Sequence, residues 1–245
     1  PFFIVHKKGL KKDQLRPTLL TGYGGFDISY TPSFTPAFFA LLEKGGVFAL
    51  ANIRGGGEYG KKWHEGGFRH QKQHSFDDFI AVAETLIKEG YTSPSHLGIT
   101  GGSNGGLLVA ASMLQRPDLF SSVIIRKGVL DMLRFQYFTI GWAWTSEYGN
   151  SENQEDFHTL YAYSPLHRIQ KGVNYPATLI TTADHDNRVV PFHSYKFAAT
   201  LQSLGGKKNP YLLRVYPNSG HGMGAPRQLY IEEMTDLLTF LLCSF

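Results

Sequence analysis

The sequence predicts one α/β domain in which a mostly parallel sheet carries helices on both faces. The chain has 245 residues, of which 42% are hydrophobic, enough for one large buried core. Short apolar runs typical of buried strands recur along it, and amphipathic helical patterns separate them. Strands that alternate with helices favour a parallel sheet, because the crossover helices pack on its two faces.

Six apolar segments rich in β-forming residues are expected to be strands. They cover residues 17–21, 47–53, 97–100, 122–125, 177–182 and 212–216. Each is short and bounded by polar or glycine-containing turns, as expected for strands buried on both faces.

The clearest predicted helix begins at Ser75, which forms a capping-box-like start with Asp78. Its apolar residues recur at three- and four-residue steps and are Phe76, Phe79, Ile80, Ala83, Leu86 and Ile87. Gly90 is expected to end this helix. Similar faces predict helices at residues 107–114 and 195–204, and near the end of the chain one stripe is shared by Ile231, Met234, Leu238 and Leu241.

Composition excludes several classes of protein. The net charge is +4 and the basic residues are scattered apart from a short cluster at residues 7–16, which argues against nucleic-acid binding. The single cysteine, Cys243, excludes an internal disulfide and a multi-cysteine zinc site, and it fits a reducing compartment. No apolar run is long enough to predict a membrane span.

The N-terminal sequence PFFIVHKKGLKK has neither an initiator Met nor the layout of a signal peptide. The chain is therefore consistent with a piece of a longer protein. Together with the single cysteine, this leads us to expect a cytoplasmic location.

The segment GGSNGG around Ser103 follows a predicted strand and precedes a predicted helix, which is the context that G-x-S-x-G requires. Such a nucleophile elbow holds the serine in a strained conformation, and Gly101 and Gly105 leave room for the close approach of strand and helix. The serine oxygen then lies at a helix N-terminus, where the dipole favours developing negative charge. The alternative is a glycine-rich turn with an incidental serine. The context favours an α/β-hydrolase fold with Ser103 as nucleophile.

A serine nucleophile needs a base and an acid that orients the base, and in this fold their order is serine, acid, histidine. His221 is the one of the ten histidines that lies between glycines and between the last predicted strand and the last helix, where the base is expected. Asp184 and Asp186 both follow the strand at 177–182. Spacing leaves both open as the acid, and either could instead cap its own turn.

The segment GGGEYGKK at residues 55–62 matches G-x-G-x-x-G and nearly matches a P-loop. We expect no nucleotide site there. The next clear predicted helix begins only near Ser75, so no helix N-terminus is placed to hold a phosphate, and Lys62 stands where a P-loop needs Ser or Thr.

Five motifs occur in the same order as in the catalytic domain of the prolyl oligopeptidase family, which the whole chain resembles. They are YGGF at 23–26, NIRGGGEYG at 52–60, GGSNGG around Ser103, DHDNRVVP at 184–191 and GHG around His221. Several motifs in order are more specific than any one of them. GGSNGG together with YGGF favours the prolyl branch over its relatives in the clan.

The resemblance implies a role for each site residue. The acid is Asp186, so the triad is Ser103, Asp186 and His221. The oxyanion hole combines the backbone N–H of Asn104 with the hydroxyl of Tyr23. Arg188 binds a substrate carbonyl next to the scissile proline. An apolar pocket accepts the proline ring and is formed by Phe26, Val129, Ile140, Trp144 and Tyr148. The alternative for this pocket is ordinary core or a partner-binding patch.

Two departures from the family pattern stand out. Asn187 replaces a second aspartate, and Arg126-Lys127 replace small or neutral residues after a predicted strand. Residues 1–245 are expected to form one peptidase domain, without the family's β-propeller and N-terminal segment.

These features predict a serine endopeptidase that needs no cofactor or metal and hydrolyses short peptides on the C-terminal side of proline through an acyl-enzyme. Its partners are expected to be proline-containing peptides, with no nucleic acid and no membrane, and the sequence gives no oligomeric state. Two alternatives are a broad-range serine esterase and a catalytically silent binding domain with the same fold.

Overall fold

The computed structural model describes residues 1–13, 15–222 and 226–245. Its centre is a seven-stranded sheet in the order β1-β3-β2-β4-β5-β6-β7. The strands are β1 Phe2–Val5, β2 Thr18–Gly22, β3 Val47–Ala51, β4 Leu97–Gly102, β5 Ser122–Arg126, β6 Ala177–Ala183 and β7 Tyr211–Tyr216. The β1–β3 pair is antiparallel and every other pair is parallel. All six predicted strands are confirmed, with ends that shift by one or two residues.

The helices confirm the α/β prediction and add short elements to it. They are α1 Phe39–Glu43, α2 Lys61–Glu65, α3 Gln73–Lys88, α4 Asn104–Gln115, α5 Thr145–Tyr148, α6 Gln154–Tyr163, α7 Pro165–Arg168, α8 Phe192–Leu204 and α9 Arg227–Cys243. No helix in the described ranges is long and apolar enough to cross a bilayer.

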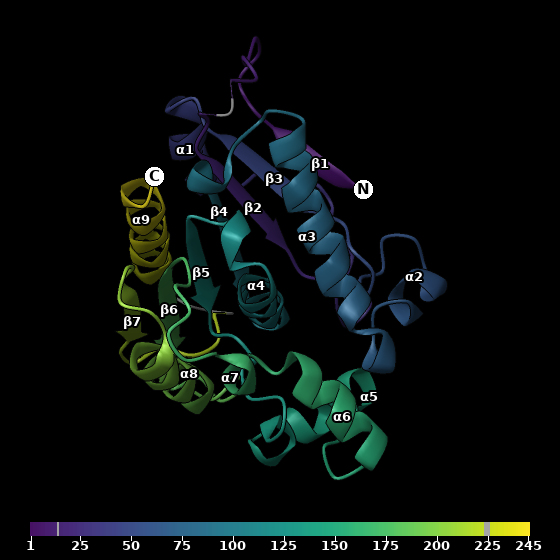
Figure 1. Cartoon of the computed structure of the whole chain (residues 1–245). Helices are drawn as coiled ribbons and strands as arrows, with labels where there is room; N and C mark the ends of the chain where they lie inside the picture. Colours follow the sequence, from purple (N-terminus) through teal and green to yellow (C-terminus); the bar gives the residue numbers. More distant parts are fainter. Residues whose placement is uncertain (14, 223–225) are drawn as a thin grey trace.

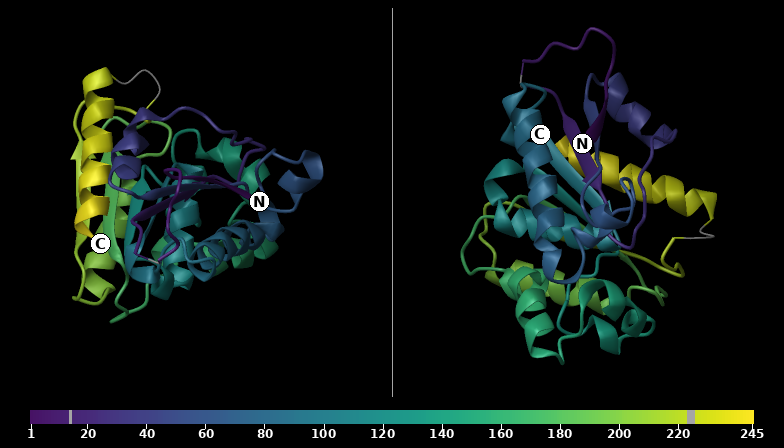
Figure 2. Two further views of the ribbon diagram at one scale, coloured as in Figure 1. Left: turned by 90° about the horizontal axis from the view of Figure 1, so that it is seen from above. Right: turned by 90° about the vertical axis from the view of Figure 1, so that its right-hand side faces the viewer.

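Two hydrophobic cores lie on opposite faces of the sheet. The larger one contains buried side chains of α3, α4 and α8, including Phe79, Leu108 and Phe197. The smaller one joins Leu41 of α1 and Leu241 of α9 to strand residues. Figures 1 and 2 show α9 and α1 on the face of the sheet away from α3 and α4. This is the three-layer arrangement expected of a largely parallel sheet.

The start of α3 differs from the prediction. The helix begins at Gln73, and its N-terminal boundary residue Lys72 makes no side-chain cap. Ser75 Oγ instead donates to the carbonyl of Arg54 at 2.7 Å, and Asp78 pairs with the Arg54 side chain. The capping-box interpretation was therefore wrong, because both side chains bind a loop outside the helix. The predicted end is confirmed: Gly90 has φ +77°, and its N–H donates to Ile87 O at 3.0 Å.

The strand order reverses between β2 and β4, because β3 lies on one side of β2 and β4 on the other. Ligands of open α/β sheets bind at the carboxyl ends of the strands near such a switch point. The predicted site residues Tyr23, Ser103, Asp186 and His221 follow β2, β4, β6 and β7 along the chain. The parallel topology therefore gathers them at one edge of the sheet.

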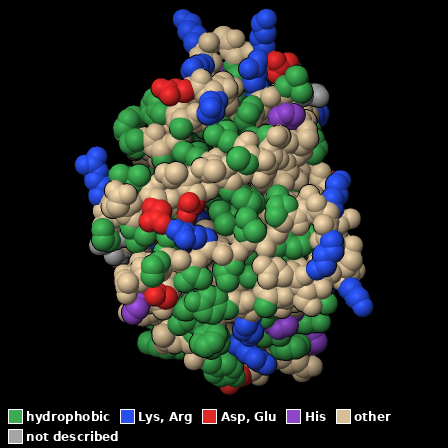
Figure 3. Space-filling model, turned by 90° about the vertical axis from the view of Figure 1, so that its left-hand side faces the viewer, with side chains coloured by type: hydrophobic (Ala, Val, Ile, Leu, Met, Phe, Trp, Pro, Cys, Tyr) green, Lys and Arg blue, Asp and Glu red, His purple; other side chains and the backbone are tan. Residues whose placement is uncertain are grey.

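A helical excursion between β5 and β6 carries four of the five predicted pocket residues, Val129, Ile140, Trp144 and Tyr148. It contains α5, α6 and α7 and lies below the sheet in Figure 1. The flank with α9 and β7, on the left in Figure 1, is the face shown in Figure 3, where hydrophobic side chains surround a small group of acidic and basic ones. On this flank, Arg214 of β7 pairs with Glu232 and Asp236 of α9.

Candidate active site

Ser103 occupies a strained turn between β4 and α4. Its backbone has φ 56° and ψ −120°, a conformation that costs free energy for a residue with a side chain. A Cβ on Gly101 would lie 2.1 Å from the carbonyl oxygen of Gly105, so only glycine allows this approach of strand and helix. The strand, the turn and the glycine requirement all agree with the predicted nucleophile elbow.

Asn104 is the first residue of α4, so its backbone N–H has no partner within the helix and can bind an anion. Its side chain is buried and held from both sides. Asn104 Nδ2 donates to Tyr23 O at 2.6 Å, and Asn104 Oδ1 accepts from the Tyr148 hydroxyl at 2.8 Å. Burial, and to a lesser degree Tyr23, raises the pKa of Tyr148, which keeps this hydroxyl protonated. These bonds fix the residue after the serine.

Asp186 and His221 meet at the ends of β6 and β7. The Asp186 Oδ2 to His221 Nδ1 distance is 2.6 Å, and Asp186 is 2% exposed. Its second oxygen, Oδ1, accepts the backbone N–H groups of Arg188 at 3.0 Å and Val189 at 2.9 Å. The carboxylate is thus anchored, and it holds the Nδ1 side of the imidazole so that Nε2 is the nitrogen left for proton transfer.

Asp184, the other aspartate that spacing left open, lies elsewhere. Its Oδ1 atom is 2.7 Å from His185 Nδ1, and both side chains are exposed. The hydrogen bond from His185 is the main reason that the pKa of Asp184 falls below its usual value. Asp184 therefore bonds to its neighbour in the turn and not to His221.

Ser103 and His221 line one cavity of about 480 Å³, together with Tyr23. Among the described residues, no hydrogen bond joins the Ser103 hydroxyl to the His221 ring. Burial raises the pKa of Tyr23, with Tyr30 as a smaller cause in the same direction and the adjacent Ser103 hydroxyl opposing them. The Tyr23 ring stacks on Tyr30 with 5.5 Å between centroids. A protonated phenol therefore lies beside the serine, as an oxyanion donor must.

Arg188 is exposed, and its charge is close enough to Tyr23 to lower the phenol's pKa slightly. It lies on the same turn as Asp186. The neighbouring Asn187 is also exposed, so the family departure at this position leaves the contacts of Asp186 intact.

The five residues predicted to form a proline pocket differ in their burial. Phe26, Val129, Trp144 and Tyr148 belong to, or pack against, one hydrophobic cluster, whereas Ile140 is 45% exposed. Phe26 and Tyr148 meet edge to face with 5.4 Å between centroids. The structure thus brings Phe26 and Tyr148 together, places Val129 and Trp144 in the same large core, and leaves Ile140 at the surface. None of the five lines the cavity that contains Ser103 and His221.

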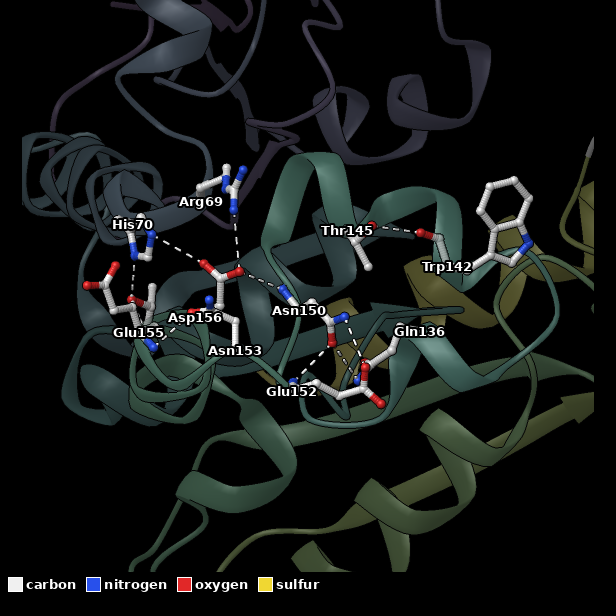
Figure 4. Close-up of polar contacts among 11 residues, drawn as sticks. Arg69, His70, Gln136, Trp142, Thr145, Asn150, Glu152, Asn153, Glu155 and Asp156 are labelled. Atoms are coloured by element: carbon white, nitrogen blue, oxygen red, sulfur yellow. Dashed lines mark hydrogen bonds and ion pairs between the residues drawn. The ribbon is translucent and has the colours of Figure 1, made fainter.

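The two tryptophans of GWAW differ. Trp144 is half-buried and stacks on Phe135 at a centroid distance of 6.4 Å. Trp142 is 67% exposed, and its indole turns away from the polar contacts in Figure 4. Sequence reasoning missed Phe135, which also meets Tyr148 edge to face at 5.3 Å. Its wholly buried side chain gave no local signal of a role beside the pocket.

The excursion that carries Trp144 is attached to the rest of the molecule by polar contacts around Asp156 (Figure 4). The Asp156 carboxylate accepts the backbone N–H of Asn150 at 2.9 Å and lies 3.4 Å from Arg69 Nη2 and 3.2 Å from His70 Nε2. Helix α6 is itself capped by Asn153 Oδ1, which accepts from two backbone N–H groups. These contacts hold the pocket segment in place.

Glu147 makes a second contact between the excursion and the rest of the molecule, at the loop after β2. Glu147 is 4% exposed, and its Oε1 accepts the backbone N–H of Phe26 at 2.7 Å, while its Oε2 lies 2.8 Å from His64 Nε2. Phe26 has a positive φ of 59°. Glu147 was not predicted from the sequence, because its partners lie more than 80 residues away. It joins the excursion to the segment that carries Tyr23.

The glycine-rich segment at 55–62 supports the same loop. The next clear helix was expected only near Ser75, but the five-residue α2 starts at Lys61, within this segment. Glu58 Oε1 accepts the Tyr30 N–H at 2.9 Å, and a Cβ on Gly57 would lie 2.4 Å from Asp27 O. The glycines thus allow close packing against the segment after β2.

The two cations at the end of β5, Arg126 and Lys127, have different surroundings. Lys127 has φ 48°, and its Nζ pairs with Glu233 of α9 at 2.8 Å. Arg126 faces the cavity beside Ser103. In the described part of the chain, no group of three His, Cys, Asp or Glu side chains is placed to hold a metal ion.

Comparison with known proteins places this chain in a family. The family model described as "Prolyl oligopeptidase family" matches residues 32–245. A prolyl endopeptidase from Elizabethkingia miricola is 50% identical over 99% of this chain, and one from Dictyostelium discoideum is 51% identical over 98%. These matches cover 34% and 32% of the relatives, so the chain spans about a third of their length.

Solved structures agree with the sequence matches. A prolyl endopeptidase structure superposes with a TM-score of 0.98 at 49% identity, covering 100% of this chain and 36% of that one. A post-proline cleaving enzyme from Rickettsia typhi gives a TM-score of 0.96 at 40% identity, covering 100% and 35%. The fold is thus that of an α/β-hydrolase, and the chain belongs to the prolyl oligopeptidase family.

Proposed function

We propose that the protein is a serine endopeptidase that hydrolyses short peptides after proline through an acyl-enzyme. The observation that carries the proposal is the grouping of three residues. Ser103 on its strained turn shares a cavity with His221, and His221 Nδ1 is hydrogen bonded to the buried carboxylate of Asp186. We propose further that residues 1–245 form one peptidase domain.

In the proposed reaction, Ser103 Oγ attacks the carbonyl carbon of the proline residue while His221 Nε2 takes its proton. The negative charge that forms on the carbonyl oxygen is met by the Asn104 N–H and the Tyr23 hydroxyl. His221 then gives the proton to the leaving nitrogen as the C–N bond breaks. Water then attacks the carbonyl carbon of the acyl-enzyme while His221 Nε2 takes its proton. The ester bond breaks, and His221 returns the proton to Ser103 Oγ. Asp186 keeps the imidazole in the required tautomer.

The proline ring is assigned to the apolar cluster of Phe26, Val129 and Tyr148, with Trp144 stacked on its flat face and Ile140 at the rim. An apolar pocket disfavours charged side chains, because an unpaired buried charge is costly. Arg188 is assigned to a substrate carbonyl on the acyl side. The partners are therefore proline-containing peptides, and we propose a cytoplasmic location on the basis of the single Cys243.

The test uses the natural full-length protein that contains this chain. Turnover of a peptide amide ending in proline is compared with its alanine counterpart and with a simple ester, and labelling by a fluorophosphonate probe is measured in parallel. We expect proline-dependent turnover, with labelling and turnover both lost in Ser103→Ala and retained in the exposed control Ser95→Ala. Ester turnover without proline preference would contradict the peptidase proposal, and absence of labelling would favour a silent domain.

A further inference from the structure

The cavity beside Ser103 lies away from the proposed proline pocket. Along the chain, Asn104 contacts Tyr148 of that pocket, whereas Gly102, on the other side of the serine, faces Arg126. The register of the sheet explains this, because Gly102 of β4 pairs directly with Arg126 of β5. The cavity of about 480 Å³ is within the range of roughly 300–1,000 Å³ typical of small-ligand sites. The serine therefore has a binding region on each side.

The Arg126 guanidinium lines this cavity without an ion-pair partner among the described residues. Its Nε is buried and has no hydrogen-bond partner in residues 1–13, 15–222 and 226–245, and no ion pair of Arg126 occurs there. A Cβ on Gly102 would lie 3.7 Å from Arg126 Nη2, which places the guanidinium one residue from the nucleophile. The guanidinium thus lies next to the residue before the nucleophile and has no carboxylate bonded to it.

The groups around Arg126 leave its charge in excess. The groups whose charge favours the protonated guanidinium are Tyr30, Tyr216, Tyr230 and Glu233, and Tyr23, Lys127 and His221 line the same cavity. Glu233 already pairs with Lys127 at 2.8 Å, so the single carboxylate is shared with a second cation. Burial lowers the pKa of Arg126, as expected for a cation with reduced access to water. An unpaired charge in such a place is costly, and an anion that enters the cavity would relieve that cost.

We propose that Arg126 is a specificity-determining residue that binds a carboxylate in the departing half of the peptide substrate. This inference rests on the proposed function. If the acyl half occupies the proline pocket, the departing half must leave on the other side of Ser103. His221, which hands the proton to the leaving nitrogen, lines this same cavity. The planar guanidinium fork suits a carboxylate, which comes either from the C-terminus of the peptide or from an Asp or Glu side chain.

The test measures kcat/KM of the full-length protein on matched pairs of peptides that share one N-blocked Gly-Pro acyl half. One pair compares Ala-Ala with a free carboxylate against Ala-Ala amide as the departing half. The other pairs compare Glu with Gln, at the first or second position after proline, in amidated peptides. Because the departing half takes part in acylation, its contacts appear in kcat/KM. The first pair reports the terminal carboxylate and the others report side chains.

We expect at least one acidic peptide to exceed its neutral match by about tenfold or more, the size of one charge-assisted hydrogen bond. The ratio of kcat/KM between acidic and neutral peptides should fall to near one in Arg126→Gln and take an intermediate value in Arg126→Lys. It should be unchanged in Arg116→Gln, which removes an equal charge from a surface ion pair with Glu84. The ratio within each variant corrects for any loss of folded enzyme.

Equal kcat/KM in every pair for the wild-type protein would overturn the inference without need of any variant. A preference that persists in Arg126→Gln would overturn it as well. Cleavage after proline without a carboxylate preference would leave the proposed function standing and remove only the role of Arg126. Failure to cleave any of the peptides after proline would instead contradict the proposed function.

Discussion

At the scale of single residues, the turn after β6 contains two aspartates that are chemically alike and differently placed. Asp186 is buried, accepts two backbone N–H groups and is bonded to His221 Nδ1. Asp184 is exposed and bonded to His185. Separating them from the sequence required a family resemblance, because two residues of spacing carry no geometric information about which side chain points inward.

Substitution of these aspartates should therefore have unequal effects. We expect Asp186→Asn to lower kcat by about 10⁴-fold toward a proline peptide amide, because the amide stabilises the wrong imidazole tautomer. Asp184→Asn makes the same chemical change on the same turn and should leave kcat close to the wild-type value. Steady-state kinetics of the two variants, with folding checked by circular dichroism, test the difference. A comparable loss in both would argue against Asp186 as the orienting acid.

The two tryptophans of GWAW provide a second matched pair. Trp144→Ala should lower kcat/KM for a proline peptide by about ten- to a hundredfold, the range for loss of one large pocket contact. Trp142→Ala should change it little, since that side chain is 67% exposed. The ratio of kcat/KM between proline and alanine peptides is the informative measurement. If Trp144→Ala kept the proline preference, the cluster would be core and not a substrate pocket.

At the scale of elements, the strands were predictable because their sequences reflect burial on both faces. The exception is β1, whose sequence FFIV is apolar throughout and shows period-two burial only once it pairs with β3. The start of α3 was mispredicted because Ser75 and Asp78 bind Arg54, more than 20 residues away. Glu147 escaped prediction for the same reason, whereas Phe135 did so because a buried aromatic residue looks like ordinary core. Local patterns identify elements, whereas long-range contacts decide which side chains support the site.

The N-terminus of α3 is joined to the loop after β2 by a buried lysine. Lys72 is 1% exposed, and its Nζ donates to the carbonyl of Gly24, one residue after Tyr23, at 2.5 Å. Burial lowers the pKa of Lys72 from 10.5 to about 8, with Glu147 opposing the shift. The protonated lysine therefore carries a desolvation cost in the folded state that the unfolded chain does not have.

This cost predicts a pH dependence of stability. Below pH 8 both states hold the proton and the cost is present in full, whereas between pH 8 and 10.5 the folded state loses the proton first. The free energy of unfolding should then rise with pH across this window, by up to roughly 3 kcal/mol from this group. Denaturant unfolding of wild type and Lys72→Met at several pH values isolates the effect, because other groups titrate equally in both. A difference between the two that stays constant from pH 8 to 10.5 would refute the shift.

At the scale of the whole molecule, the residues that stabilise the fold and the residues of the proposed site lie in different parts of the mostly parallel sheet. The proposed site residues lie in loops at one edge of the sheet, while the two cores lie on its faces. The smaller core depends on α9, whose buried residues Met234, Leu237 and Leu241 cover β2, β5 and β6. A Cβ on Gly98 would lie 2.3 Å from Leu241 Cδ1, so this helix packs directly on the backbone of β4.

Shortening Leu241 should therefore weaken the fold without altering the site. We expect Leu241→Ala, at a fully buried position, to lower the free energy of unfolding by about 2–5 kcal/mol. Ile231→Ala on the same helix is the control, because Ile231 is 46% exposed and its truncation should cost much less. Denaturant unfolding measures the loss of stability. The value of kcat/KM well below the unfolding temperature shows whether the active site is altered. Since α9 begins at Arg227, after His221, a drop in kcat/KM of the folded enzyme would mean that α9 also positions the catalytic loop.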